Sequence, residues 1–368
     1  MDATGSIRLA ACDCLTPLGN AAHTHAALLA GTRALHPTPV LGRDGGDLVP
    51  LALLPGRALD ETVPPTWLQA MQTLLAPLAG DGWGTARKPV CFTSSNFGVG
   101  SLHAFRRSGD PAHAAYGTPA ASIEQIRHTL GWGTHFAIFS HACVSAHLGL
   151  LHATRMIQAG LADSALVVSY DFLSPFVAGG FHSLKILNAD LPAPYMARDT
   201  GSIGLGDGAA YAVLTRDQGA LSIMEQHLHN EMYHFTANRP DGAGFATALA
   251  PLAHAAAGRR LWVKGHGTGT LEAGRLEAHA FALAFPGAPL VGWKGSLGHT
   301  LGSCGLVELA LAATALQTGQ TPGTVGTSAP TFTDTVATAP FENRAYDGVV
   351  CASNAFGGAH AALLLCHA

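Results

Sequence analysis

Charged residues are scarce in this chain. Asp, Glu, Lys and Arg make up only 12% of its 368 residues, and the formal net charge is −4 at pH 7. Runs of basic residues are missing, so we expect no binding of nucleic acid and no attachment to a charged membrane surface. Hydrophobic residues make up 48% of the chain, which indicates a folded protein with a large core and excludes extensive disorder.

Signals for export, membrane insertion and disulfide formation are missing as well. The first residues, MDATGSIRLA, lack the basic region and apolar core of a signal peptide, and we expect no apolar stretch long enough to span a bilayer. The seven cysteines are odd in number and lack framework spacing, which favours a reducing, cytoplasmic location. Cys12 and Cys14 form a CxC pair without a partner pair, so we predict no metal site.

The stretch from Phe136 to Asp171 has the clearest structural pattern. A short apolar run at each end flanks a segment with apolar residues at helical spacing, and Gly160 stands where a helix C-cap is expected. The pattern predicts strand, tight turn, helix and strand, with Cys143 at the helix N-terminus, where unpaired N–H groups and the helix dipole favour a thiolate. Free cysteines are mostly core residues, so Cys143 alone does not define a site.

Strand, small-residue loop and helix alternate along the rest of the chain. We predict strands at 6–12, 90–92, 209–215, 261–263, 290–293, 349–351 and 361–366, and helices at 21–31, 66–78, 121–130, 276–284 and 305–317. Residues 36–65, rich in Pro, Gly and Asp, are expected to form an irregular surface excursion. The recurring pattern suggests two similar α/β layers with reactive residues at strand ends. No linker is visible, so we expect one compact unit with halves at 1–217 and 218–368.

The glycine-rich segment GSIGLGDG, at 201–208, resembles a phosphate loop only superficially. We expect no strand before it and no helix after it, and a phosphate loop requires both. We therefore predict no nucleotide and no other cofactor.

Two histidines differ in context from most of the 20 in the chain. His266 and His299 each follow a predicted strand in a loop of Gly, Ser and Thr, which lets a substrate approach the backbone. Imidazole N–H groups can stabilise the negative charge that develops on a thioester oxygen, while a cysteine thiolate can hold an acyl group covalently. Lys294 and Glu308 flank His299. They could form a surface ion pair, but Glu308 is the lone acid on an apolar helix face, which favours a buried pair.

The motifs around these residues resemble those of the β-ketoacyl-(acyl carrier protein) synthases, the type I/II condensing-enzyme family. The resemblance covers nearly the whole length and rests on TPLGN, HACVSAHLGL, HGTGT, KGSLGHTLGSCGLVE and SNAFGGAHA, in the family's order. The second histidine separates the chain from the type III initiating synthases, which have asparagine there. Thiolases carry a second cysteine in a C-terminal CxG motif, which this chain lacks.

The resemblance implies an acyltransferase with a thiolase fold: two duplicated βαβ halves in a five-layer α-β-α-β-α arrangement. It implies that Cys143 accepts an acyl chain and that His266 and His299 bind a malonyl thioester during decarboxylation. Lys294, paired with Glu308, would orient His299. The backbone N–H groups of Cys143 and Phe356 would form an oxyanion hole. These site residues are implied by the family's motifs and not by spacing.

Two departures from the family pattern concern the loops. Where the HGT motif is usually followed by an Asp, this chain has Gly274, although Glu277 is retained. The segment SNAFGG, at 353–358, is about two residues shorter than the family's glycine-rich loop. Both changes affect the expected gate over the acyl pocket and leave the catalytic residues in place.

Two functions from different classes remain open. The first is a β-ketoacyl synthase of fatty-acid, polyketide or aryl-polyene biosynthesis, with an acyl carrier protein as its partner. The second is a non-catalytic partner subunit that resembles a chain-length factor. Such subunits typically lose the active cysteine, so Cys143 with both histidines favours the enzyme. The resemblance implies a dimer in either case, formed with a second copy or with a related ketosynthase subunit.

Overall fold

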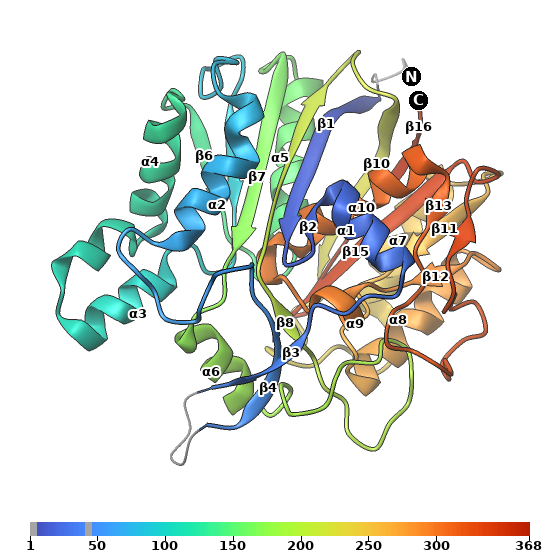
Figure 1. Cartoon of the computed structure of the whole chain (residues 1–368). Helices are drawn as coiled ribbons and strands as arrows, with labels where there is room; N and C mark the ends of the chain where they lie inside the picture. The colour runs from blue at the N-terminus through green and yellow to red at the C-terminus, as the bar shows by residue number, and fades with distance from the viewer. Residues whose placement is uncertain (1–5, 41–45) are drawn as a thin grey trace.

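Two five-stranded layers lie at the centre of the computed structural model, which describes residues 6–40 and 46–368 (Figure 1). The first layer has the order β1 (Ile7–Thr16), β9 (Gly208–Thr215), β7 (Ser164–Asp171), β5 (Val90–Thr93) and β6 (Phe136–Phe139). The second has the order β10 (Leu221–Asn230), β16 (Ala359–His367), β15 (Gly348–Ala355), β11 (Leu261–Lys264) and β12 (Leu290–Val291). A short antiparallel pairing of β1 with β10 joins the two layers.

The two layers repeat one pairing pattern. Counted outward from the β1–β10 junction, each layer has two antiparallel pairings followed by two parallel ones. Parallel neighbours need crossover connections, and helices supply them in both halves. This repetition matches the expected duplication of a βαβ unit.

Helices fill the space between the layers and cover both outer faces. The middle layer contains α1 (Ala21–Leu29), α5 (Ser145–Gln158) and α10 (Cys304–Thr318), whose apolar residues form one core cluster with strands of both halves. α2 (Thr66–Leu75) and α4 (Pro119–Leu130) pack against the outer face of the first layer. α7 (Ala243–Ala255) and α8 (Leu271–Ala284) cover the second layer. The arrangement is the predicted five-layer α-β-α-β-α fold.

The remaining elements lie outside the two five-stranded layers and the helices named above. They are β2 (Gly19–Asn20), β3 (His36–Pro39), β4 (Leu48–Ala52), α3 (Val99–Ser108), α6 (Pro175–Ser183), β8 (Leu205–Gly206), α9 (Lys294–Leu297), β13 (Gln320–Thr321) and β14 (Phe341–Glu342), with 3₁₀ turns at Ala76–Leu78, Pro111–Tyr116 and Leu301–Ser303.

The prediction of an irregular excursion at 36–65 is wrong in part. β3 and β4 pair antiparallel, and β4 pairs with β8, which gives a small three-stranded sheet. The two prolines of β3 are tolerated because this strand lies at the sheet edge. Residues 41–45, between the two strands, lie outside the described residues.

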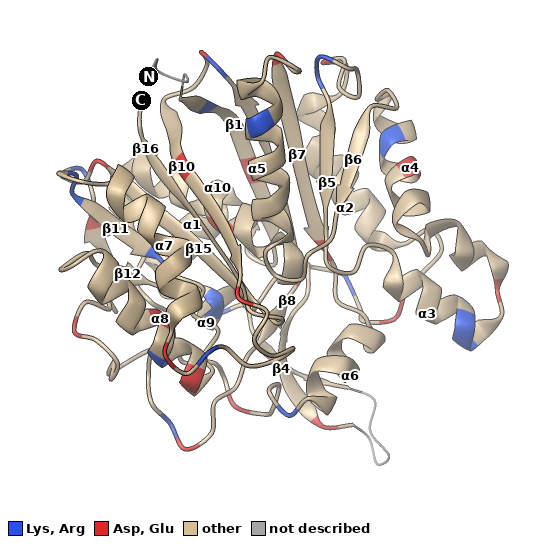
Figure 2. Cartoon of the chain, turned by 180° about the vertical axis from the view of Figure 1, so that it is seen from behind, with Lys and Arg blue, Asp and Glu red and all other residues tan. Residues whose placement is uncertain are grey.

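The expectation that no apolar stretch is long enough to span a bilayer also needs correction. Among the described residues, one window, Leu301–Thr318, is apolar and long enough to cross a membrane by length and composition. In the fold 83% of that window is buried, because α10 lies in the middle layer. Figure 2 shows acidic and basic residues scattered mainly over loops and helices, while the strands carry few.

Candidate active site

A tight corner between β6 and α5 positions Cys143. Ala142, just before the cysteine, has φ of 45°, in the left-handed region that non-glycine residues rarely adopt. The hydroxyl of Ser145 donates to the carbonyl oxygen of Ala142 at 2.7 Å and accepts from the N–H of His141 at 2.8 Å. One side chain thus holds both sides of the corner, and backbone strain of this kind is typical of functional sites.

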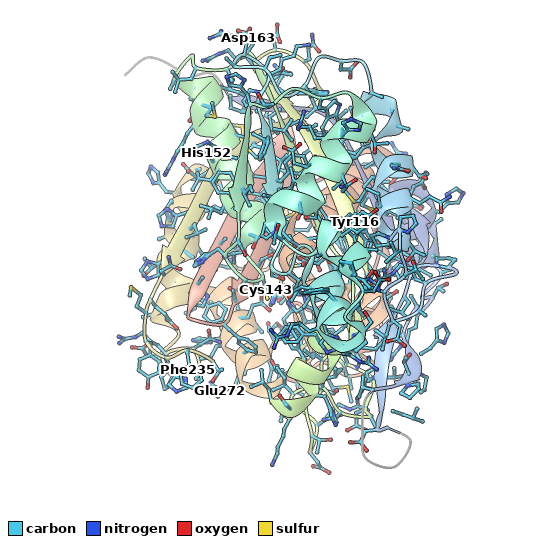
Figure 3. The ribbon with its side chains drawn as sticks, turned by 90° about the vertical axis from the view of Figure 1, so that its left-hand side faces the viewer. Tyr116, Cys143, His152, Asp163, Phe235 and Glu272 are labelled. Carbon is cyan, nitrogen blue, oxygen red and sulfur yellow. The ribbon has the colours of Figure 1, made fainter. Side chains whose placement is uncertain are left out.

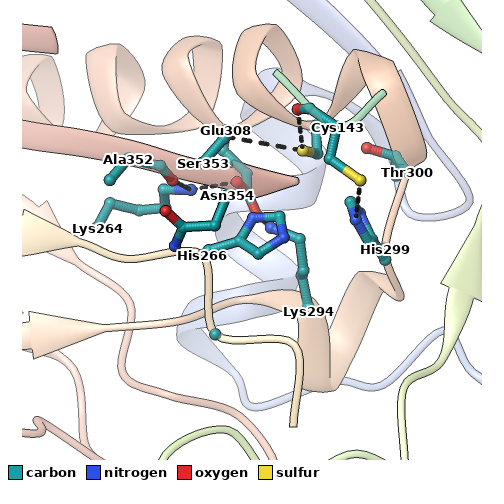
Figure 4. A network of polar contacts seen from close by, with 12 residues as sticks. Cys143, Lys264, His266, Lys294, His299, Thr300, Glu308, Ala352, Ser353 and Asn354 are labelled. Carbon is teal, nitrogen blue, oxygen red and sulfur yellow. Dashed lines mark hydrogen bonds and ion pairs between the residues drawn. The ribbon is translucent and has the colours of Figure 1, made fainter. Parts of the chain in front are cut away.

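The structure brings Cys143, His266 and His299 together, as the sequence predicts (Figure 4). Their donor atoms all lie within 4.8 Å of one another. The two imidazole rings stand almost perpendicular, with centroids 4.8 Å apart. His299 Nε2 lies 3.0 Å from Cys143 Sγ. Cys143 comes from the β6–α5 corner and His266 from the loop after β11, while His299 comes from the segment after α9, so both halves of the fold contribute.

The backbone fixes the tautomer of His299. The N–H of Leu301 donates to His299 Nδ1 at 3.2 Å, so Nδ1 must carry a lone pair. In the neutral ring the proton is therefore on Nε2, which faces Cys143 Sγ. Burial, followed by the charge of Lys294, lowers the pKa of His266 and of His299 well below the ordinary range. Both rings are thus neutral near pH 7, and His299 presents an N–H donor to the cysteine.

The acidity of Cys143 differs from the expectation. Cys143 is only 9% exposed, and burial raises the pKa of its thiol, with a smaller contribution from Cys304; Lys294 acts in the opposite direction. Loss of hydration therefore outweighs the helix N-terminus that was expected to favour a thiolate. The resting side chain is a thiol beside the N–H of His299.

Lys294 and Glu308 form the buried ion pair that the sequence predicts. Lys294 Nζ lies 2.6 Å from Glu308 Oε1, and both side chains are almost fully buried. The structure adds a third member, Lys264, which donates to the other oxygen of Glu308. Sequence reasoning missed Lys264, although a lysine that ends the apolar strand LWVK was a visible signal.

Glu277 holds the loop that carries His266. Its carboxylate accepts the N–H of His266 at 2.5 Å, the N–H of Gly267 at 2.9 Å, the hydroxyl of Tyr195 at 3.0 Å and the side-chain amide of Asn354 at 3.0 Å. Gly274, one turn earlier on α8, is buried. The loop after β11 is therefore fixed by Glu277, without a carboxylate at position 274.

Asp171 holds the loops on the other side of the site, as Glu277 holds the loop of His266. Its buried carboxylate accepts backbone N–H groups from Ser95, Asn96 and Ser303 at 3.0–3.1 Å and the hydroxyl of Ser94 at 2.8 Å. These contacts tie the loop after β5 to the segment after His299. Burial, which outweighs these hydrogen bonds, raises the pKa of Asp171 to about 6. Sequence reasoning gave this residue no role.

A cavity of about 250 Å³ opens above the cysteine. Its lining includes Cys143, His266 and His299 together with apolar side chains, among them Phe181, Ile186, Ile203 and Phe356. The rings of Phe181 and Phe356 stack with centroids 6.3 Å apart, and Phe356 is 40% exposed. Phe356 follows β15, in the predicted loop. In Figure 3 Cys143 lies near the middle of the view, with Phe235 and Glu272 nearer the lower edge.

The chain matches two family models in sequence. Residues 118–220 match the N-terminal domain of β-ketoacyl synthases, and residues 222–328 match the C-terminal domain. The tetracenomycin polyketide synthase ketoacyl synthase alpha subunit of Streptomyces glaucescens is 27% identical over 68% of this chain. The 3-oxoacyl-[acyl-carrier-protein] synthase 2 of Coxiella burnetii is 29% identical over 67% of it. The match spans 64% of the length of each relative.

Solved structures match the whole fold. A ketosynthase (ApeO) in complex with its chain length factor (ApeC) from Xenorhabdus doucetiae gives a TM-score of 0.82 at 23% identity, over 99% of this chain and 98% of the other. A β-ketoacyl synthase from Burkholderia phymatum gives 0.79 at 21% identity, over 99% and 100% of the two chains. These likenesses confirm the predicted thiolase fold. Because adjoining segments of the sequence match both domain models, the chain belongs to the β-ketoacyl synthase family.

Proposed function

We propose that the chain is a β-ketoacyl synthase that joins an acyl group on Cys143 to a unit derived from a malonyl thioester. The observation that carries the proposal is the 3.0 Å contact between His299 Nε2 and Cys143 Sγ, with Nε2 kept protonated by the Leu301 N–H. A nucleophile and a fixed N–H donor thus share the end of one cavity.

The first step is transfer of the acyl group. The sulfur of Cys143 attacks the carbonyl carbon of an acyl thioester, and the carrier's thiol leaves with the proton that Cys143 gives up. Negative charge forms briefly on the carbonyl oxygen. We assign its stabilisation to the backbone N–H groups of Cys143 and Phe356, and removal of such a donor costs about 3 kcal/mol in other enzymes.

The second step is decarboxylation and condensation. The thioester carbonyl of the malonyl group accepts hydrogen bonds from His266 and His299, loss of CO2 leaves an enolate, and the enolate carbon attacks the acyl-Cys143 thioester. The products are a 3-ketoacyl thioester and the thiolate of Cys143, which takes up a proton from water to return to the resting thiol. Neutral imidazoles suit this role, because they donate a hydrogen bond without transferring their proton. Burial first, and then the charge of Lys294, which Glu308 holds in place, lower the pKa of both rings and keep them neutral.

We further propose an acyl carrier protein and a second ketosynthase subunit as partners. Among similar structures, one is a type II polyketide synthase acyl-carrier protein in complex with its ketosynthase bound to the hexaketide, and another pairs a ketosynthase with its chain length factor. An acyl carrier protein delivers its acyl group on a long flexible arm, and such an arm suits a cysteine at the end of a cavity. We also propose a cytoplasmic location, which the seven free cysteines support.

The alternative, a non-catalytic partner subunit, has less support. Such a subunit needs the pocket shape but does not need a cysteine, two neutral histidines and a buried lysine–glutamate pair in one cluster. Burying each of these groups costs desolvation free energy, and a subunit that only shapes the pocket would not need to bury them.

A reconstitution experiment tests the proposal. The purified chain, alone and with a related ketosynthase subunit, is incubated with an acyl-carrier-protein thioester and with malonyl-carrier protein labelled with ¹³C in its free carboxylate. We expect a 3-ketoacyl product and one labelled CO2 for each condensation. In the two-subunit sample Cys143→Ala in this chain should abolish the product; undiminished product would assign the chain to the non-catalytic class.

A further inference from the structure

A second buried lysine lies beside the Lys294–Glu308 ion pair. Lys264, the last residue of β11, is 1% exposed. Its ammonium group donates to Glu308 Oε2 and to the carbonyl oxygen of Ala352, the latter at 3.1 Å. Lys294 occupies the other carboxylate oxygen. One carboxylate thus lies between two ammonium groups (Figure 4), and none of these three residues lines the cavity.

The cluster of Lys264, Lys294 and Glu308 has two positive groups and one negative group. Burial of each charged group is costly, so packing alone does not explain a second lysine here. Burial is the largest single influence on Lys294 and opposes its charge, but Glu308, Cys304 and Glu277 together outweigh burial and raise the pKa of Lys294. The cluster therefore places two positive charges near the reacting groups, opposite the carboxylates of Glu308 and Glu277.

Titratable groups surround the cluster. They are Cys143, Cys304, Cys351, His147, His266, His299, Glu277 and Tyr195. Burial first, and then the charges of Lys294 and Lys264, lower the pKa of His299. The same cations oppose the effect of burial on the pKa of Cys304. The charge of Lys264 thus acts on the histidine that contacts Cys143.

We propose that Lys264 is a positioning residue that holds Glu308 opposite Lys294 and supplies a second positive charge behind Cys143, His266 and His299. The inference rests on the proposed function for its chemistry, in which negative charge develops on sulfur, on a carbonyl oxygen and on an enolate. Fixed positive charge nearby stabilises each of these species. Lys264 does not line the cavity, so it acts through Glu308 and Lys294 and not on the substrate.

Two substitutions separate the charge of Lys264 from its hydrogen bonds. Lys264→Met removes both, whereas Lys264→Gln removes the charge and keeps a donor for Ala352. Glu308 retains Lys294 in both variants, so neither leaves a buried carboxylate unpaired. Lys88→Met, at an exposed lysine, is the matched control. Thermal unfolding identifies any variant that fails to fold. If Lys264→Met does not fold, the result for Lys264→Gln decides alone.

The first readout needs no substrate. Iodoacetamide alkylates the thiolate, so the rate at Cys143, followed by peptide mass spectrometry near neutral pH, reports its thiolate fraction. We expect both Lys264 variants to react about tenfold more slowly than the parent, equivalent to one pKa unit, and Lys88→Met to match the parent. Parent-like alkylation in a folded Lys264→Gln would overturn the proposal, because hydrogen bonding and not charge would then be the function of Lys264.

The second readout is the kinetics of malonyl-thioester decarboxylation. We expect kcat to fall about tenfold in both Lys264 variants with KM unchanged, because the lost interaction acts on developing charge. A rise in KM with kcat unchanged would contradict the role. If the parent chain decarboxylates no malonyl thioester, the proposed function fails, while the alkylation rates still decide the role of Lys264.

Discussion

At the scale of single residues, the two site histidines differ in how they are held. His299 has a fixed tautomer, because its Nδ1 accepts the N–H of Leu301. His266 is buried, and its Nδ1 has no hydrogen-bond partner within the described part of the chain. Its position is instead set through the backbone, whose N–H groups at His266 and Gly267 are bound by Glu277. The two rings are therefore expected to contribute separately to catalysis.

Replacing either histidine should separate acyl transfer from decarboxylation. In His266→Ala and His299→Ala we expect Cys143 still to accept an acyl group, because the proposed oxyanion hole is made of backbone N–H groups. Decarboxylation of malonyl thioester should fall by at least a hundredfold, about 3 kcal/mol, because a donor to the developing enolate is lost. Separate assays of acyl adduct and CO2 release measure the two steps. Full condensation by either variant would rule out the assigned roles.

Several residue contacts could not be predicted because they join distant parts of the chain. Asp171 binds residues 94–96 and 303, and Glu308 binds Lys264, 44 positions earlier. Motifs place Cys143, His266 and His299 at loops beside strand ends, and the parallel strands bring these loops to one edge of the fold. The raised pKa of Cys143 was not foreseeable either, because burial depends on packing from both halves.

At the scale of elements, periodicity predicts most of the regular structure. The run 136–139 is β6 as predicted, and the predicted helix 305–317 differs from α10 by one residue at each end. The misses have physical causes. β3 pairs with β4, and β4 also pairs with β8, about 150 positions later in the chain, so local composition could not show that they form a sheet.

The neighbouring elements also explain how the strained backbone at Ala142, in the corner between β6 and α5, is stabilised. Ala142 has φ of 45°, which costs of order 1–3 kcal/mol. Ser145, in the first turn of α5, binds the N–H of His141 and the carbonyl oxygen of Ala142, and α5 packs its apolar face into the middle layer. The position of Cys143 therefore depends on α5 as a whole and not on the turn alone.

At the scale of the whole molecule, burial of many histidines links stability to pH. Burial lowers the pKa of His25, His147, His266, His299 and His360. For His147 the pKa falls to about 3, against an ordinary value near 6.5. Between these values the unfolded chain binds a proton that the folded chain does not. The contribution of His147 to stability is therefore complete above pH 6.5 and is lost as the pH falls toward 3.

Replacing His147 should flatten this pH dependence. Between pH 6.5 and pH 5 the parent should lose about 2 kcal/mol of unfolding free energy through His147 alone. His147→Gln lacks the titrating group, so its stability relative to the parent should rise by that amount over the same range. Urea unfolding of both proteins at the two pH values measures the difference. Parallel losses in the two proteins would show that His147 does not titrate as its burial implies.

The division of the chain into halves at residue 217 stays an interpretation, although the repeated pairing pattern agrees with duplication. The layers share one middle layer of helices, and the candidate site uses groups from both. This arrangement predicts that catalytic function needs the whole chain.

The most direct test of the account is the mass of the peptide that contains Cys143 after the chain has been incubated with an acyl-carrier-protein thioester. The account predicts an increase equal to the acyl group on Cys143 and on none of the other six cysteines. The adduct should be missing in Cys143→Ala, whose fold should remain intact. Absence of an adduct on the parent chain with its partner subunit present, or an adduct on another cysteine that persists in Cys143→Ala, would contradict it.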